Sequence, residues 1–144
     1  MSEPRIVRVS DVMETSVHRI SGLANVREAI VEMNRHRVSS LVIDRRDDDD
    51  EFGVITVRDI AAHVVARNRS TVRTSVYEIM TKPAMTLDSE MNIKYAMRLL
   101  SRFHLTRALV THGKDLLGIV TLRDMVLGYL ESTDSTPESG DTAD

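Results

Sequence analysis

The stretch GVITVRD, at Gly53–Asp59, recurs sixty-five residues later as GIVTLRD, at Gly118–Asp124. The glycine, threonine, arginine and aspartate keep identical spacing, and the positions between them are apolar in both copies. A motif written twice within 144 residues indicates that a larger segment of the chain is duplicated. The flanking sequence tests this interpretation.

The similarity extends well beyond the seven residues. A shift of 67 residues places VSDVMETSVHRI (Val9–Ile20) on VYEIMTKPAMTL (Val76–Leu87), and NVREAIVEMNR (Asn25–Arg35) on NIKYAMRLLSR (Asn92–Arg102). The shift falls to 65 after the loop RRDDDDE, because that loop is two residues longer than its counterpart. A half-domain of about 60 residues is small for an independent core, so we expect the two halves to depend on each other.

Each half follows the same predicted order, β-α-β-β-α. Apolar residues recur at the helical spacing i, i+3, i+4, i+7 within Asn25–Arg35 and Asn92–Arg102. Short strands are expected at SVHRI, SSLVID and FGVIT in the first half, and at PAMTL, RALVT and LLGIVT in the second. A last helix is expected in each half, at VRDIAAHVVAR and LRDMVLGYLE. The predicted fold class is therefore α+β, with tandem β-α-β-β-α repeats.

These predictions divide the chain into four parts. They are a first repeat at residues 9–67, a linker at 68–75, a second repeat at 76–131 and an acidic tail at 132–144. The tail, STDSTPESGDTAD, is rich in small and acidic residues and poor in apolar ones. We therefore expect it to be disordered.

Composition excludes several classes of function. The net charge is −3, which gives no overall attraction to nucleic acid or to an anionic membrane. The chain has no cysteine, so disulfide and thiol chemistry are excluded. No apolar run approaches the roughly 20 residues that span a bilayer, and the first ten residues, MSEPRIVRVS, lack the apolar core of a signal peptide. We expect a cytoplasmic protein with no membrane partner.

Metal and catalytic motifs are not recognisable. The five histidines show no paired metal-ligand spacing. The acidic run DDDDE lacks the alternating spacing and central glycine of a calcium loop, and we interpret it as a solvated hairpin tip. We predict neither a metal site nor catalytic residues.

The repeated motif has a structural interpretation. Thr56-x-x-Asp59 and Thr121-x-x-Asp124 match the pattern in which a threonine caps a helix and an acidic residue caps back three positions later. In this interpretation the glycine permits a special backbone angle.

A functional interpretation can coexist with the structural one. A strand that leads into a helix N-terminus presents free N–H groups, which suit a phosphate, and an aspartate there can accept hydrogen bonds from the two hydroxyls of a ribose. Arg58 and Arg123 fall in the first helical turn, where a cation opposes the helix dipole. This placement favours a nearby anion.

The doubled β-α-β-β-α unit, each copy ending in this motif before a helix, resembles a pair of CBS (cystathionine β-synthase) domains, also called a Bateman module. The resemblance covers about Val9–Glu131 and includes DVMETSVHRI, EIMTKPAMTL and VSSLVID. It implies that the two repeats pack with pseudo-twofold symmetry. It also implies a regulatory module rather than an enzyme, one that binds AMP, ADP, ATP or S-adenosylmethionine in clefts between the repeats.

The resemblance also implies roles for individual residues. Asp59 and Asp124 would take the ribose hydroxyls, and Thr56 and Thr121 would take phosphate. The adenine pocket would be lined by residues of the leading segments, namely Ser16, His18, Pro83 and Met85.

A basic residue just before the middle strand often holds phosphate in this family. In the second repeat the position is Arg107, beside Thr106, whereas in the first repeat it is Ser40, beside Ser39. We therefore expect the cleft that contains Asp124 to bind nucleotides more tightly than the other cleft.

Two classes of function remain open. One is an adenine-nucleotide sensor that acts on an effector protein. The other is a structural association module, or a nucleic-acid binder that uses the arginines of the linker, although few aromatic residues are present for stacking on single strands. The sensor is favoured because threonine and aspartate are present in both copies, and nucleic acid is not an expected partner. We also predict a homodimer, because the last helix of each half is apolar on more than one face.

Overall fold

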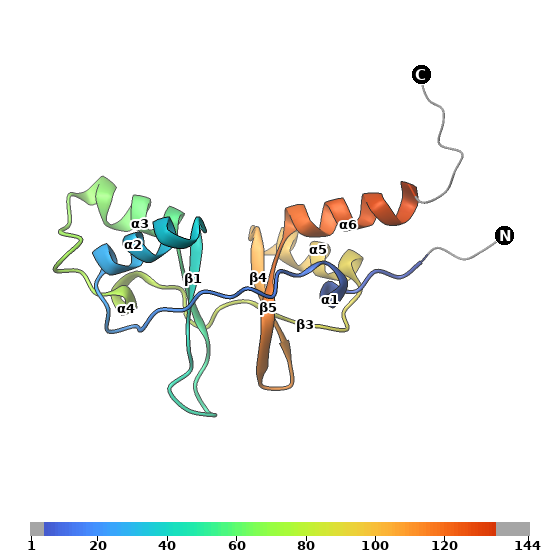
Figure 1. The fold of residues 1–144 in the computed structure, drawn as a ribbon, viewed down its shortest axis with the longest axis horizontal. Helices are drawn as coiled ribbons and strands as arrows, with labels where there is room; N and C mark the ends of the chain where they lie inside the picture. Colours follow the sequence, from blue (N-terminus) through green and yellow to red (C-terminus); the bar gives the residue numbers. More distant parts are fainter. Residues whose placement is uncertain (1–4, 135–144) are drawn as a thin grey trace, which may run out of the picture. The chain divides into compact units, whose positions relative to one another are not determined.

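The computed structural model describes residues 5–134 and contains two compact units. The first unit is Ser16–Ala84, and the second unit combines Met1–Thr15 with Met85–Asp144. Both mix helices with a small sheet, which confirms the predicted α+β class (Figure 1). Residues 135–144, most of the predicted tail, lie outside the described part of the chain.

The first unit contains a two-stranded antiparallel sheet, in which Ser40 lies opposite Thr56. Its elements, in chain order, are α2 (Val26–His36), β1 (Ser40–Ile43), β2 (Gly53–Thr56), α3 (Val57–His63), the 3-10 turn η1 (Val65–Arg67) and α4 (Val76–Ile79). The predicted strand at SVHRI is reduced to a single parallel bridge between Arg19 and Val42. The predicted last helix is divided into α3 and η1.

The second unit contains a three-stranded sheet in the order β3-β4-β5, parallel in its first pair and antiparallel in its second. Its elements are α1 (Val9–Val12), β3 (Thr86–Asp88), α5 (Ile93–Arg102), β4 (Arg107–His112), β5 (Asp115–Thr121) and α6 (Leu122–Asp134). Helix α6 continues three residues past its predicted end at Glu131, and the hydroxyls of Ser132 and Thr133 donate to backbone carbonyls one turn earlier.

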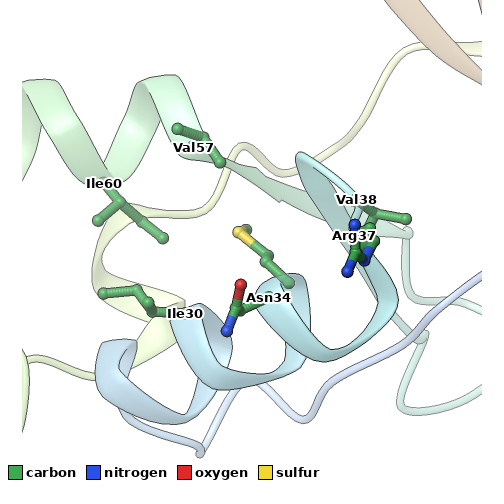
Figure 2. Close-up of a pocket in the computed structure, with 7 residues that line it drawn as sticks. Ile30, Asn34, Arg37, Val38, Val57 and Ile60 are labelled. Carbon is green, nitrogen blue, oxygen red and sulfur yellow. The ribbon is translucent and has the colours of Figure 1, made fainter.

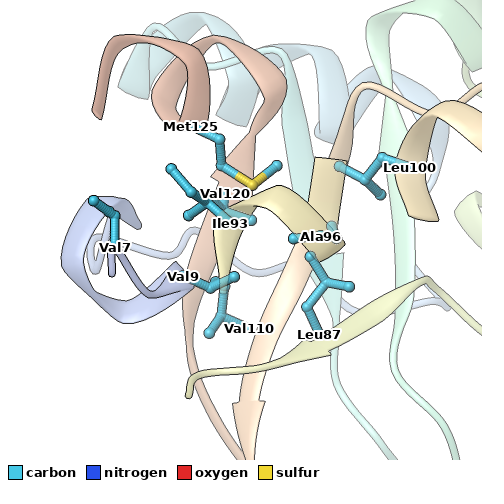
Figure 3. Close-up of a cluster of buried hydrophobic side chains, with 10 residues drawn as sticks. Val7, Val9, Leu87, Ile93, Ala96, Leu100, Val110, Val120 and Met125 are labelled. Carbon is cyan, nitrogen blue, oxygen red and sulfur yellow. The ribbon is translucent and has the colours of Figure 1, made fainter. Parts of the chain in front are cut away.

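Each unit has its own aliphatic core. In the first unit, Val26, Ala29 and Met33 of α2 pack with β1, β2, α3 and α4. In the second unit, α5 packs against the sheet, α1 and α6, with Met125 fully buried, as Figure 3 shows. The buried positions of both helices follow the helical period that the sequence predicted.

The two units exchange their leading segments. The backbone of Glu14 forms two hydrogen bonds with Ile119 of β5, 2.8 and 2.9 Å long. At the equivalent position, Thr81 forms two hydrogen bonds with Val54 of β2, 2.8 and 2.9 Å long. The start of each sequence repeat therefore completes the unit that holds the rest of the other repeat.

This exchange explains the glycine of the repeated motif. A Cβ atom on Gly118 would lie 2.5 Å from the carbonyl oxygen of Glu14, and one on Gly53 would lie 3.1 Å from the sulfur of Met80. Among the described residues, Gly113 is the only glycine with a positive φ. The expectation of a special backbone angle at Gly53 and Gly118 was therefore wrong, and the glycine is needed for the close approach of the leading segment.

Candidate functional site

The threonine and aspartate of the repeated motif cap helices α3 and α6. Thr56 Oγ1 accepts from the Asp59 backbone N–H at 3.1 Å, and Asp59 Oδ2 accepts from the Thr56 N–H at 3.0 Å. Thr121 and Asp124 repeat this reciprocal pair at 3.0 and 3.1 Å. The structural interpretation of the motif is confirmed. All four side chains are half-buried.

Capping leaves these groups with further capacity. An ionised carboxylate accepts about four hydrogen bonds, and a hydroxyl can donate as well as accept. One hydrogen bond to each aspartate therefore does not exhaust its acceptors. A ligand with hydroxyl or phosphate groups could bind at the same end of the strand without displacing the cap.

The sheets bring further predicted residues to the motif. In the second unit, Arg107 lies directly opposite Thr121, and the Leu122 N–H donates to the Thr106 carbonyl at 2.9 Å. Opposite residues of an antiparallel pair project to the same face, with Cβ atoms about 4.5–5.5 Å apart. Thr106, Arg107, Thr121 and Asp124 are thus gathered where β5 passes into α6.

The first unit has the same arrangement with different chemistry. Ser40 lies opposite Thr56, and the Val57 N–H donates to the Ser39 carbonyl at 2.9 Å. Ser39, Ser40, Thr56 and Asp59 are therefore the counterparts of the second set, without its guanidinium. The side chains of Arg58 and Arg123 are exposed, each in the first turn of its helix.

Two residues of the predicted adenine pocket occupy equivalent backbone positions. The His18 carbonyl accepts from Val42 N–H in the first unit, and the Met85 carbonyl accepts from Leu109 N–H in the second, both at 2.9 Å. Ser16 and His18 belong to the first unit with Ser39 and Ser40. Pro83, which follows a cis peptide bond, belongs to the first unit, whereas Met85 belongs to the second.

The structure contains a stacked pair of histidines that the sequence analysis did not predict. The ring of His18 stacks on that of His36 with centroids 4.0 Å apart and planes 17° from parallel. His36 Nε2 lies 3.2 Å from Glu32 Oε1. The two histidines are eighteen positions apart, and nothing in their spacing indicates the contact. Met85 and Phe103 occupy the equivalent positions of the second repeat.

The acidic loop is a solvated hairpin tip at four of its five acidic residues, as predicted, and Asp50 is the exception. The Asp50 carboxylate lies 2.8 Å from Lys82 Nζ and accepts from the Arg46 backbone N–H at 2.9 Å. The hydrogen bond from Lys82, followed by that from the Arg46 backbone, holds the pKa of Asp50 well below its usual range. The side chain is only 10% exposed. Asp50 therefore anchors the loop to the chain just before Pro83.

An open groove of about 360 Å³ lies on the helical side of the first unit, as Figure 2 shows. Its lining is mainly apolar, with one amide and one guanidinium: Ile30, Met33, Asn34, Arg37, Val38, Val57 and Ile60. None of the predicted ligand-binding residues lines it. Two lining residues, Val38 and Val57, are sequence neighbours of Ser39 and Thr56, so the groove borders the first cluster without including its predicted ligand-binding residues.

Metal-binding clusters and membrane-spanning helices are both absent from the described part of the chain. Among residues 5–134, no cluster of histidine and acidic side chains is arranged to hold a metal ion. Over the same residues, every helix is too short or too polar to cross a bilayer.

Comparison with known proteins places the chain in a family. The family model for the CBS domain matches twice, at residues 9–66 and 76–131. An uncharacterized protein of Methanopyrus kandleri is 30% identical over 132 residues, which is 90% of this chain and 67% of that protein.

Solved structures agree with the family model. The structure of the hexameric CBS-CP12 protein from bloom-forming cyanobacteria is 29% identical with a TM-score of 0.84, over 96% of this chain and 80% of that one. A CBS domain protein from Pyrobaculum aerophilum, complexed with AMP, is 20% identical with a TM-score of 0.73, over 87% and 99% of the chains. The second likeness shows the fold alone. The chain belongs to the CBS domain family, and the duplicated sequence is a pair of CBS domains.

Proposed function

We propose that this CBS pair is a regulatory sensor of an adenosine-containing ligand, with AMP, ADP, ATP and S-adenosylmethionine as the candidates. The observation that carries the proposal is the doubled cluster at the strand-to-helix junction, with a capping threonine and aspartate in each unit. The AMP complex of the Pyrobaculum aerophilum protein supports this ligand class.

Each residue of the second cluster has a distinct role in the proposal. The Asp124 carboxylate accepts hydrogen bonds from the ribose hydroxyls. Thr121, Thr106 and Arg107 surround the phosphate, to which the guanidinium supplies a charge-assisted hydrogen bond. The exposed guanidinium of Arg123 adds positive charge in the first turn of α6. Met85, which belongs to the same unit, provides an apolar wall for the base.

The first cluster is the weaker nucleotide site. Asp59 and Thr56 repeat the ribose and phosphate contacts, and Ser39 and Ser40 offer only hydroxyls where the second cluster has a guanidinium. Arg58 supplies charge from the first turn of α3, and Ser16 and His18 line the base. A ligand with less negative charge is favoured here.

The module has no catalytic role in this proposal. Its output is a change in an effector protein or in its own assembly, and it forms a homodimer. Exposed apolar side chains on the last helices support self-association, among them Val126 at 53% exposure and Val65 at 58%. The CBS-CP12 relative is a hexamer, so assembly is to be measured directly.

Calorimetry tests the sensor proposal. The protein is titrated with AMP, ADP, ATP and S-adenosylmethionine, and with adenosine and GMP as controls for the phosphate and the base. We expect saturable binding of at least one adenosyl ligand and none of GMP. Ligand at a hundred times its dissociation constant adds about 2.7 kcal/mol of stability, which raises Tm by very roughly 5–10 °C. Absence of both heat and melting shift with all adenosyl ligands would refute the proposal.

A further inference from the structure

The stacked pair of His18 and His36 lies close to the first cluster. His36 comes three residues before Ser39, so the Cα atoms of these two residues are at most about 11 Å apart. The His18 carbonyl accepts from the N–H of Val42, two residues after Ser40. A charge on the pair can therefore act on an anion bound at the cluster, because the Debye length is about 10 Å at about 0.1 M salt.

The surroundings of His36 stabilise a positive charge on its ring. Its Nε2 lies 3.2 Å from Glu32 Oε1, and a carboxylate forms its stronger hydrogen bonds with charged donors. His36 is also in the last turn of α2, where a cation interacts favourably with the helix dipole. Two charged rings stacked 4.0 Å apart would repel each other. We therefore expect the pair to carry one positive charge at acidic pH, on His36.

The other charged groups around the pair keep their charge over the same pH range. Arg35 is paired with Glu32, and Arg19 is paired with Asp44. Strands β1 and β2 contain no titratable residue. The remaining charged neighbours of the pair and the cluster are Arg37, Arg58 and Asp59. Guanidinium groups and carboxylates ordinarily keep their charge between about pH 5 and about pH 8, whereas histidine ordinarily does not. Among these groups, the histidines are therefore the ones that respond to pH.

The second repeat has no equivalent of the pair. The positions of the glutamate and the two histidines are occupied there by apolar residues, which take up no proton: Leu99, Met85 and Phe103. The second cluster has the guanidinium of Arg107 instead, which is always charged. The two repeats thus differ in the kind of positive charge near each cluster, permanent in the second and dependent on a proton in the first.

We propose that the histidine pair is a proton-dependent cation for the first cluster and makes ligand binding there depend on pH. This inference rests on the sensor proposal. At acidic pH, the charge on His36 attracts an anionic adenosyl ligand and supplies part of what Arg107 supplies in the second cluster. At alkaline pH the charge is absent, and the first cluster binds the anion more weakly. The first cluster therefore responds to ligand and pH together, and the second responds to ligand alone.

Calorimetry in the Asp124→Ala background measures the first cluster by itself. The probe is adenosine 5′-sulfate, because its charge stays constant, whereas a phosphate ester itself takes up a proton near about pH 6. We expect the probe to bind about two- to tenfold more tightly at about pH 5.5 than at about pH 8, as one unit charge at this distance allows. Binding between these pH values should take up protons, seen as a heat that differs between buffers of different ionisation enthalpy. AMP is the second probe, since its own protonation affects the parent and the variants equally.

The second repeat supplies matched replacements for the variants. His36→Phe keeps a ring in the stack but takes up no proton, so the pH dependence should disappear. Glu32→Leu should reduce the gain at acidic pH, because the carboxylate no longer stabilises the charge. His36→Arg should bind the probe at about pH 8 as tightly as the parent does at about pH 5.5, since a guanidinium stays charged.

Two controls separate the pair from general effects of pH. His63→Gln changes an exposed histidine at the far end of α3 and should keep the pH dependence of the parent. The second cluster, measured in the Asp59→Ala background, should bind the sulfate probe equally at both pH values. Circular dichroism and light scattering check that each variant keeps the fold and assembly of the parent.

Three results would overturn the inference. They are an affinity of the first cluster for the sulfate probe that does not change with pH, the same pH dependence in His36→Phe as in the parent, and the same pH dependence in the second cluster. Binding without these pH effects leaves the sensor proposal intact and removes only the role of the pair. If no adenosyl ligand binds at either pH, the sensor proposal fails and this inference fails with it.

Discussion

Arg107 lies directly opposite Thr121 in the antiparallel pair of β4 and β5, at the position where Ser40 lies opposite Thr56 in the first unit. The two units therefore present the same backbone arrangement with and without a guanidinium. This difference sets the order of ligand affinities that the sensor proposal predicts.

The second cluster should bind nucleotides more tightly than the first cluster. Asp124→Ala should abolish the tighter isotherm for AMP or ATP, and Arg107→Ala should weaken it about ten- to a hundredfold, since a hydrogen bond to a charged group is worth about 1.5–3 kcal/mol. Adenosine binding should be little changed by Arg107→Ala. Calorimetry that assigns the tight site to Asp59 instead would reverse the order.

The first cluster should gain affinity when it receives the missing charge. Ser40→Arg introduces the guanidinium opposite Thr56, and we expect about tenfold tighter binding of AMP at that site. The measurement is made in the Asp124→Ala background so that one isotherm remains. Ser40→Gln is the uncharged control, and an equal gain from it would show that charge is not the cause.

The glycine of the second motif should be needed for stability. Gly118→Ala places a Cβ within 2.5 Å of the Glu14 carbonyl oxygen, and overpacking of this kind costs about 1–3 kcal/mol. Gly53→Ala should cost less, because its nearest neighbour is the flexible end of Met80 at 3.1 Å. Urea unfolding measures both variants, and equal losses would contradict the close-approach explanation.

The Asp50–Lys82 pair should give a pH-dependent contribution to stability. Lys82 holds the pKa of Asp50 below its ordinary value of 3.8 in the folded protein. The contribution is therefore fully present above about pH 5 and is lost progressively as the pH falls through 3.8 toward the lower pKa of the folded protein. The difference in unfolding free energy between the parent and Lys82→Met should shrink between pH 5 and pH 3. If this difference in unfolding free energy stayed constant over that pH range, the Asp50–Lys82 pair would not be a source of pH-dependent stability.

Self-association should be visible in solution. Light scattering should report about twice the chain mass of 16.2 kDa if the exposed apolar residues of α6 form the dimer contact. Leu130→Lys, at a position 49% exposed, should shift the population toward monomer without loss of helical signal. A monomer at micromolar concentration would refute the homodimer, and a larger mass would indicate a higher assembly.

The sequence alone determined most of the local structure. The Thr-x-x-Asp spacing fixed both helix caps, because a capping box depends only on residues three positions apart. The helical spacing of Val26, Ala29, Ile30 and Met33 likewise predicted the inward face of α2. Three of these four residues are buried, whereas Ile30 is 38% exposed. The family was recognisable because its motifs are short, local stretches of sequence that occur in the same order in both repeats.

Tertiary structure decided what depends on residues far apart in the chain. The exchange of leading segments, and with it the reason for Gly118, required Glu14 to meet Ile119. The stacking of His18 on His36 and the burial of Asp50 beside Lys82 depend on similar long-range contacts. Spacing along the chain carries no record of such contacts, because they are set by how the strands align and how helices pack on them. The strand register that places Arg107 opposite Thr121 also depends on residues far apart in the chain. This register brings the repeated motif and the residues at the start of β4 together in one cluster.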